Sequence, residues 1–156
     1  MSISGLEKLD VWCKARDFAV RVSKEVLPLL PLEEKWSLNQ QLRRSSQSIP
    51  ANIAEGHGRF YFQDDVRFCY IARGSLEETL SHIVYANKVG YISETLYESL
   101  ALDGENLNRL INGYIGFLKK SKQGANEPGA TSTVRESSPG YILEDNATPL
   151  SDSNLE

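Results

Sequence analysis

Four stretches of this chain repeat apolar residues at spacings of three and four, which is the period of an amphipathic α-helix. In the first stretch, Trp12, Ala15, Ala19, Val22 and Val26 follow this spacing. Each such helix has one apolar face to bury, and short connections favour packing it against the helix before it. Because no stretch carries a strand pattern, the sequence predicts an all-α fold, an antiparallel up-down-up-down four-helix bundle.

Proline and glycine mark the expected ends of these helices. Pro31 closes the first, and the second runs from about residue 32 to Gly56. The third extends from about residue 63 to Gly90, and the fourth begins at Ser93, a good N-cap. The positions expected to face the core on these three helices are Leu38, Leu42, Ile49, Ile53, Phe68, Ile71, Ala72, Leu76, Leu80, Ile83, Leu96, Leu100, Leu107, Ile111, Tyr114 and Leu118.

Pro50 lies inside the apolar pattern of the second expected helix. An interior proline removes one backbone N–H and clashes with the carbonyl four residues earlier, at a cost of ~3 kcal/mol. Either the helix kinks or breaks at Pro50, or Pro50 ends one helix and the next residues begin another. We expect small residues around it to line a close contact with a neighbouring helix. These residues are Ser45, Ser46, Ser48, Ala51 and Ala54.

The charge of the chain is divided unevenly. The net charge is −4 over 156 residues, but residues 1–122 hold 16 basic and 15 acidic side chains, while residues 123–156 hold one arginine and six acidic residues. The second segment is also rich in Gly, Ser, Thr, Asn and Pro, and it is too polar to form a core. We therefore expect a bundle domain over 1–122 and a disordered acidic tail over 123–156. Within the tail, 141–145 is either a short docking motif or an incidental apolar cluster.

Several classes of protein are disfavoured by the sequence. No apolar run approaches the ~20 residues that cross a bilayer, and the first residues do not resemble a secretion leader. We expect a cytoplasmic protein with no membrane contact. Cys13 and Cys69 lack a CxxC companion, which favours free thiols over a disulfide or a metal site.

The residues needed for catalysis are not arranged in known patterns. A di-iron bundle needs Glu-x-x-His on two helices, and neither His57 nor His82 has a glutamate three residues before it. Glu78 precedes His82 by four residues, so a lone metal site is the alternative to a simple polar histidine. No nucleophile motif or phosphate-binding glycine loop is present. We expect no enzyme activity, no cofactor and no metal.

Arginines gather in the middle of the chain and are the best candidates for a binding surface. The guanidinium fork can donate two hydrogen bonds to one phosphate. The segment Phe60-Tyr61-Phe62 adds aromatic faces on which unpaired bases can stack. The alternative is that the arginines pair with carboxylates such as Glu77 and Glu78. The expected nucleic-acid-binding residues are Arg43, Arg44, Arg59 and Arg73.

An ordered set of motifs resembles a known family. The blocks are 41–44, 48–56, Arg59, 68–79 and 90–92, and together they look like the bacterial four-helix bundle proteins encoded in intervening sequences of 23S ribosomal RNA genes. The resemblance covers about residues 6 to 122. Ser45-Ser46 stands where many members carry two alanines. The residues that carry the structural motif are Pro50, Asn52, Glu55, Gly56, Gly74, Ser75 and Glu78.

The resemblance implies a ring-shaped homo-oligomer, with a pentamer as the expected size, and no known enzymatic activity. The family is also similar to the accessory bundle proteins of diversity-generating retroelements, which bind nucleic acid and a reverse transcriptase. Oligomerisation has a physical basis too, because this small bundle holds more aromatic residues than its interior needs. These aromatics are Trp36, Phe60, Tyr61, Phe62, Tyr70 and Tyr85.

The sequence thus favours a non-enzymatic, homo-oligomeric scaffold that binds structured RNA or other nucleic acid through its arginines. The alternative is a protein-binding adaptor or accessory subunit, for example of a reverse transcriptase, without direct nucleic-acid binding. A small-molecule or metal binder in the bundle core is a third possibility.

Overall fold

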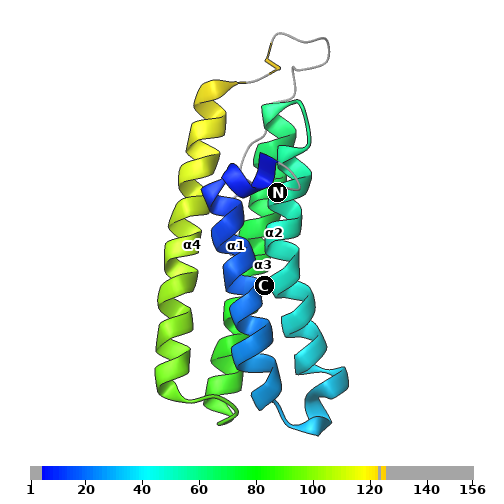
Figure 1. Ribbon diagram of the computed structural model, residues 1–156, viewed down its shortest axis with the longest axis vertical. Helices are drawn as coiled ribbons and strands as arrows, with labels where there is room; N and C mark the ends of the chain where they lie inside the picture. The colour runs from blue at the N-terminus through cyan, green and yellow to red at the C-terminus, as the bar shows by residue number, and fades with distance from the viewer. Residues whose placement is uncertain (1–4, 123, 126–156) are drawn as a thin grey trace, which may run out of the picture.

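Four long helices run side by side along the longest axis of the molecule (Figure 1). The computed structural model describes residues 5–122, 124 and 125. Within them the helices are α1 (Asp10–Arg21), α2 (Leu38–His57), α3 (Phe62–Lys88) and α4 (Glu94–Ser121), and no strand is present in this part of the chain. The predicted all-α fold is confirmed.

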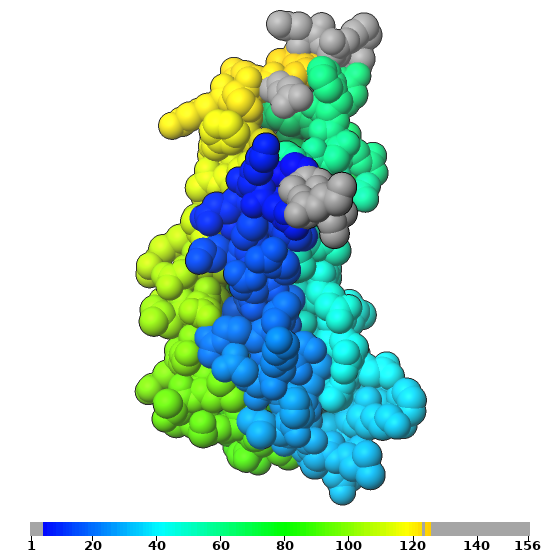
Figure 2. All heavy atoms as spheres, viewed as in Figure 1, coloured from blue at the N-terminus to red at the C-terminus, as the bar shows by residue number. Residues whose placement is uncertain are grey.

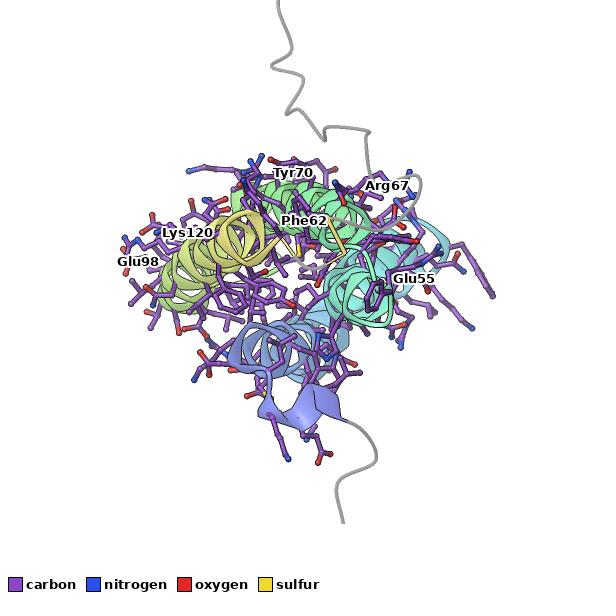
Figure 3. The ribbon with its side chains drawn as sticks, turned by 90° about the horizontal axis from the view of Figure 1, so that it is seen from above. Glu55, Phe62, Arg67, Tyr70, Glu98 and Lys120 are labelled. Atoms are coloured by element: carbon purple, nitrogen blue, oxygen red, sulfur yellow. The ribbon has the colours of Figure 1, made fainter. Side chains whose placement is uncertain are left out.

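Successive helices run in opposite directions, as the colour gradient in Figure 1 shows. Figure 3, seen from above the bundle, shows each helix beside the one that precedes it, with α4 closing the arrangement next to α1. The hydrogen bonds between α2 and α3 also show that these two helices run antiparallel. Ser45 meets Thr79 and Ser48 meets Ser75, so positions rise along α2 as they fall along α3.

The connection between α1 and α2 is built from short helical turns. A π-helical turn, η2 (Val22–Val26), and a 3-10 turn, η3 (Leu27–Leu29), extend α1, while a second 3-10 turn, η4 (Leu32–Trp36), precedes α2. The prediction that the second helix begins near residue 32 is therefore wrong. Ser37 has φ −123° and ψ −102°, which interrupts the helical path between η4 and α2. A further 3-10 turn, η1 (Gly5–Lys8), precedes α1.

The other predicted boundaries agree closely with the structure. Gly58 follows the end of α2, and Gly90 follows α3 with a φ of +85°, which glycine adopts without strain. The Ser93 hydroxyl accepts a hydrogen bond from the Leu96 N–H at 3.2 Å and so caps α4 as expected. At the other end of α4, Lys122 adopts a left-handed φ of +48°.

Apolar side chains from all four helices form one core. Leu42, Ile49, Ile53 and Leu76 are fully buried, as predicted. Ile71 is 47% exposed, so its prediction as a core residue is wrong. Neighbouring helical positions point about 100° apart, and Ala72 takes the inward direction, which leaves Ile71 on the outer face.

Helix α2 continues through Pro50 without interruption. The alternative in which Pro50 ends one helix and begins another is therefore wrong. Polar side chains bond one another in the turn that surrounds the proline. The Asn52 amide donates to the Ser48 carbonyl at 2.8 Å and to the Ser48 hydroxyl at 2.9 Å, and that hydroxyl lies 2.9 Å from the Ser75 hydroxyl on α3. These two motif residues, Asn52 and Ser75, therefore share one polar network between helices.

Small residues bring α2 and α3 close together. Ser45 and Thr79 are both fully buried, and the Thr79 hydroxyl donates to the Ser45 hydroxyl at 2.9 Å. Ser46 is also buried, as expected. The prediction is wrong for Ala51, however, which is exposed beside an open groove between α1 and α2. The close contact is made by the face of α2 that carries Ser45 and Ser48.

Gly56 allows a buried carboxylate to sit against α2. A Cβ at Gly56 would lie 2.7 Å from Asp65 Oδ1 and 2.9 Å from the Phe68 Cβ. The Tyr114 hydroxyl donates to Asp65 Oδ2 at 3.0 Å, and the Cys69 thiol lies 3.6 Å from Asp65 Oδ1. Burial raises the pKa of Asp65 above its ordinary value of 3.8, an effect that these two donors only partly oppose.

None of the described helices is both long and apolar enough to cross a membrane. The predicted disordered tail lies outside the described residues except for positions 124 and 125. The predicted domain boundary at residue 122 follows the end of α4 directly, and the independence of the two segments stays a prediction.

Replacing Gly56 by Ala should lower the free energy of unfolding by roughly 1–3 kcal/mol, because the new methyl group overpacks the contact with Asp65. Gly74 is the matched control, since it lies within α3 and a Cβ there would meet nothing within 4 Å. Gly74→Ala should stabilise the isolated bundle by about 0.5–1 kcal/mol through reduced chain entropy. Urea denaturation measures both, and equal effects of the two substitutions would contradict the close contact.

The contribution of Asp65 to the free energy of unfolding should fall as pH rises above 3.8, the ordinary pKa of an aspartate. Because the pKa of Asp65 is raised in the folded protein, the folded state holds this proton more tightly than the unfolded chain does. The stabilisation that comes from the bound proton is lost as pH rises through the raised pKa. Asparagine does not titrate, so the stability of Asp65→Asn relative to wild type should increase as pH rises. Asp64→Asn, at a more exposed carboxylate 3.5 Å from Arg67, is the control. A constant difference between wild type and Asp65→Asn in denaturation at several pH values would exclude the effect.

Candidate nucleic-acid interface

A shallow hollow of about 620 Å³ lies along the outer side of η4 and the first half of α2. The segment that forms it stands out from the bundle at the lower right of Figure 2, coloured blue to cyan. The positions repeat at intervals of three and four, so one face of α2 continues the line that begins at Trp36. The lining residues are Lys35, Trp36, Asn39, Gln40, Arg43, Arg44 and Gln47.

Glu34 fixes the orientation of η4 on α2. Its carboxylate accepts hydrogen bonds from the Ser37 hydroxyl and from the Leu38 N–H at 3.2 Å, so it caps the first turn of α2. Its other oxygen accepts from the Tyr91 hydroxyl at 3.1 Å. The Ser37 hydroxyl, followed by the Leu38 N–H, lowers the pKa of Glu34 below its usual range. Glu34 is thereby occupied at the helix start, and the two residues after it line the hollow.

Trp36 is 75% exposed at the edge of the hollow. The Lys35 ammonium lies 4.9 Å from the centre of the indole ring, within the range of a cation–π interaction. Tryptophan is enriched at binding surfaces because its ring is large and apolar and its N–H can donate a hydrogen bond.

The two arginines of the hollow differ in their partners. Arg44 forms an ion pair with Glu78 on α3 and donates to the Gln41 side chain at 3.1 Å. Arg43 makes no ion pair with any residue that the structure describes. The amides of Asn39, Gln40 and Gln47 likewise make no side-chain hydrogen bond within the described part of the chain. None of the lining residues is acidic, so the hollow presents positive charge and free amide groups.

The other predicted arginines lie elsewhere on the bundle. Arg59 lies beyond the end of α2, and the helix alone separates Arg43 from His57 by about 21 Å at 1.5 Å per residue. Arg59 pairs with Glu55 at 2.6 Å. Arg73 donates to Asn112 on α4 at 2.8 Å and lies 5.1 Å from the Tyr70 ring centre. The four predicted arginines therefore do not form one surface, and only Arg43 and Arg44 lie together.

The aromatic segment after α2 lies at the upper end of the bundle, away from the hollow. Phe60 is 56% exposed and packs edge-on against Tyr61, with ring centres 5.6 Å apart. Phe62 is partly buried against the core, and Figure 3 shows it between the helices near the bundle axis.

Sequence reasoning missed most of the hollow. It assigned Trp36 to oligomer formation and gave no role to Lys35, Asn39, Gln40 or Gln47. A signal was present, because the interval from Trp36 through Arg43 to Gln47 follows the helical period on a face opposite the apolar stripe. Attention to arginine alone concealed it.

The remaining motif residues hold α2 and α3 together or lie at the surface. Glu78 binds Arg44, and its other neighbour, His82 Nε2, lies 3.6 Å away. Gly74 faces open space. Within the described residues no group of three or more His, Cys, Asp or Glu side chains is placed to hold a metal ion.

A second depression is an apolar groove of about 490 Å³ between α1 and α2. It runs past Pro50 and the exposed Ala51, and Val20 on its α1 side is 42% exposed. The groove is lined by Leu6, Trp12, Arg16, Ala19, Val20, Ser23, Gln47, Pro50, Ala51 and Ala54.

A search of curated proteins found no match. Among solved structures, the chain is similar to a protein of unknown function from the S23 ribosomal protein family of Bacteroides thetaiotaomicron, with a TM-score of 0.62 and 28% identity over 67% of this chain and 97% of that one. The family model described as 23S rRNA-intervening sequence protein matches residues 7–113, more than half of the chain. The chain therefore belongs to the 23S rRNA-intervening sequence protein family.

Proposed function

We propose that this protein is a non-enzymatic, homo-oligomeric bundle that binds nucleic acid, with structured RNA as the expected form, through the hollow at the start of α2. One observation carries the proposal: three cationic side chains and three unpaired amides line the hollow, with no acidic residue among them. A surface of this kind favours the binding of phosphates, because each contact releases a condensed counterion from the nucleic acid.

Arg43 is the centre of this proposal. Its guanidinium lies in the hollow without a carboxylate partner among the described residues, so a phosphate can take a bidentate hydrogen bond without displacing a protein group. Arg44 also lines the hollow, but Glu78 already neutralises part of its charge. Arg59 and Arg73 already have protein partners and lie on other surfaces, so they contribute little to a site centred here.

Assembly into a ring, with a pentamer as the expected size, would multiply the hollow. The bundle leaves several large apolar side chains exposed, including Leu102 at 57% and Phe117 at 63% on α4. Burying such residues between copies gives a physical reason for oligomer formation. Several weak hollows on one particle would bind a long nucleic acid with far higher avidity than a single copy.

The chemistry of the buried polar groups supports a role without catalysis. Burial, followed by the nearby Asp65 carboxylate, raises the pKa of the Cys69 thiol, which keeps it protonated and unreactive. The Asp65 carboxylate itself is occupied by Tyr114 and packs against Gly56.

A protein-binding adaptor, such as an accessory subunit of a reverse transcriptase, is the second candidate. The apolar groove between α1 and α2 supports it, because an amphipathic helix could bury its apolar face against Val20 and Ala51. Binding there would resist salt, whereas phosphate binding weakens steeply as salt rises.

Arg43→Ala should weaken the binding of a mixed-sequence RNA and flatten its dependence on salt by about one unit of log–log slope. Arg109→Ala is the matched control, because Arg109 is a similarly exposed arginine on α4, 3.7 Å from Glu105 and outside the hollow. Fluorescence anisotropy across a salt series measures both variants. Equal losses for the two would indicate only a general charge effect, and RNA that fails to bind wild type at low salt would exclude the proposal.

In sedimentation equilibrium, the protein should behave as one species of about five times the 17.5 kDa chain mass. The mass should change little with salt if apolar side chains form the interface, because screening acts on exposed charges. A mass equal to one chain at micromolar concentration would rule out the ring.

A further inference from the structure

We propose that Trp36 is a stacking platform for an unpaired base, so that the hollow selects single-stranded RNA or DNA, including the loops of a folded RNA, over duplex. This inference rests on the proposed function and adds the form of nucleic acid that is recognised. Three observations support it: the exposed indole of Trp36, the positive charge along α2, and the unpaired amides between them.

The indole is presented rather than buried. Trp36 ends η4, and the Glu34 carboxylate bonds Ser37 and Leu38 on either side of the entry to α2, which holds the turn in place. Lys35 lies over one face of the ring at 4.9 Å. With 75% of the residue exposed, the ring has further surface open to a flat ligand. A base stacked on an aromatic side chain next to a cation is a common arrangement in single-strand-binding proteins.

Arg43 lies in the second turn of α2 and lines the same hollow as Trp36. A strand with a base on Trp36 can therefore direct its backbone along α2 toward Arg43. Between these two ends lie the Asn39 and Gln40 side chains, whose amides have no partner in the described part of the chain. An amide both donates and accepts, which suits the edge of an unpaired base.

A duplex does not fit this arrangement. Its bases are stacked on one another, so their faces are covered and only their edges are open in the grooves. Trp36 offers a flat face on a protruding turn, and an α-helix face of mixed amides and arginines lies behind it. Stacking therefore needs a base that is already unpaired, whereas Arg43 can bind the phosphates of either form.

Trp36→Ala tests the inference with two probes, a fluorescein-labelled oligoadenylate and the same strand annealed to oligouridylate. The single-strand dissociation constant should rise about tenfold, while the duplex value stays unchanged. Trp36→Phe keeps a ring and should recover most of the loss. Leu32→Ala is the matched control, because Leu32 is an apolar side chain on the same turn, 80% exposed and outside the lining of the hollow, and it should leave both values unchanged.

Tryptophan emission provides a second measurement. Oligoadenylate should quench wild-type emission through Trp36, and Trp36→Phe should abolish this quenching although Trp12 remains.

An equal loss of affinity for both probes in Trp36→Ala, or no loss, overturns the inference. A smaller sedimenting mass of Trp36→Ala also overturns it, because Trp36 would then lie between copies. If Arg43→Ala weakens both probes and Trp36→Ala weakens neither, nucleic-acid binding stands and stacking fails. Wild type that binds neither probe overturns both proposals.

Discussion

The close contact between α2 and α3 is the constraint on which the rest of this bundle depends. Buried hydroxyls of Ser45 and Thr79 bond each other, Ser48 meets Ser75, and Gly56 makes room for the Asp65 carboxylate. Side chains this small allow the two backbones to approach, and their hydroxyls satisfy one another in the core. The contact holds α2 in a fixed rotation, so its apolar stripe faces inward and the line from Trp36 to Arg43 faces solvent.

Much of the fold could be predicted from the sequence because helical periodicity is local information. Leu42, Ile49 and Ile53 identify the buried face of α2 whichever helix covers them, and Ser93 and Gly90 mark ends through their own backbone preferences. What could not be predicted depends on distant partners. Glu34 caps α2, and its other carboxylate oxygen accepts a hydrogen bond from Tyr91, 57 positions away. Ala51 lines an open groove whose other side is formed by residues of α1, which are distant in the sequence.

In the candidate site, too, local features could be predicted from the sequence and contacts with distant residues could not. The choice of Arg43 and Arg44 followed from residue type, and both arginines line the hollow, but charge alone could not reveal which arginines are already paired. Arg59 pairs with Glu55 within one turn, a spacing visible in the sequence, whereas Arg73 finds Asn112 only through the packing of α3 on α4. The separation of free from occupied cations is therefore a property of tertiary structure. It reduces four candidate arginines to one unpaired residue and one that is shared.

The shared residue gives the hollow a connection to the interior of the bundle. Arg44 bonds Glu78 across the α2–α3 contact, one position before Thr79. An anion bound to Arg44 competes with this carboxylate for the same positive charge, so occupancy of the hollow and the strength of the Arg44–Glu78 ion pair are thermodynamically linked. Glu78 acts as an internal competitor that sets how much positive charge the surface offers. A protein of this kind can adjust its affinity for a polyanion by changing a residue on α3 that never touches the ligand.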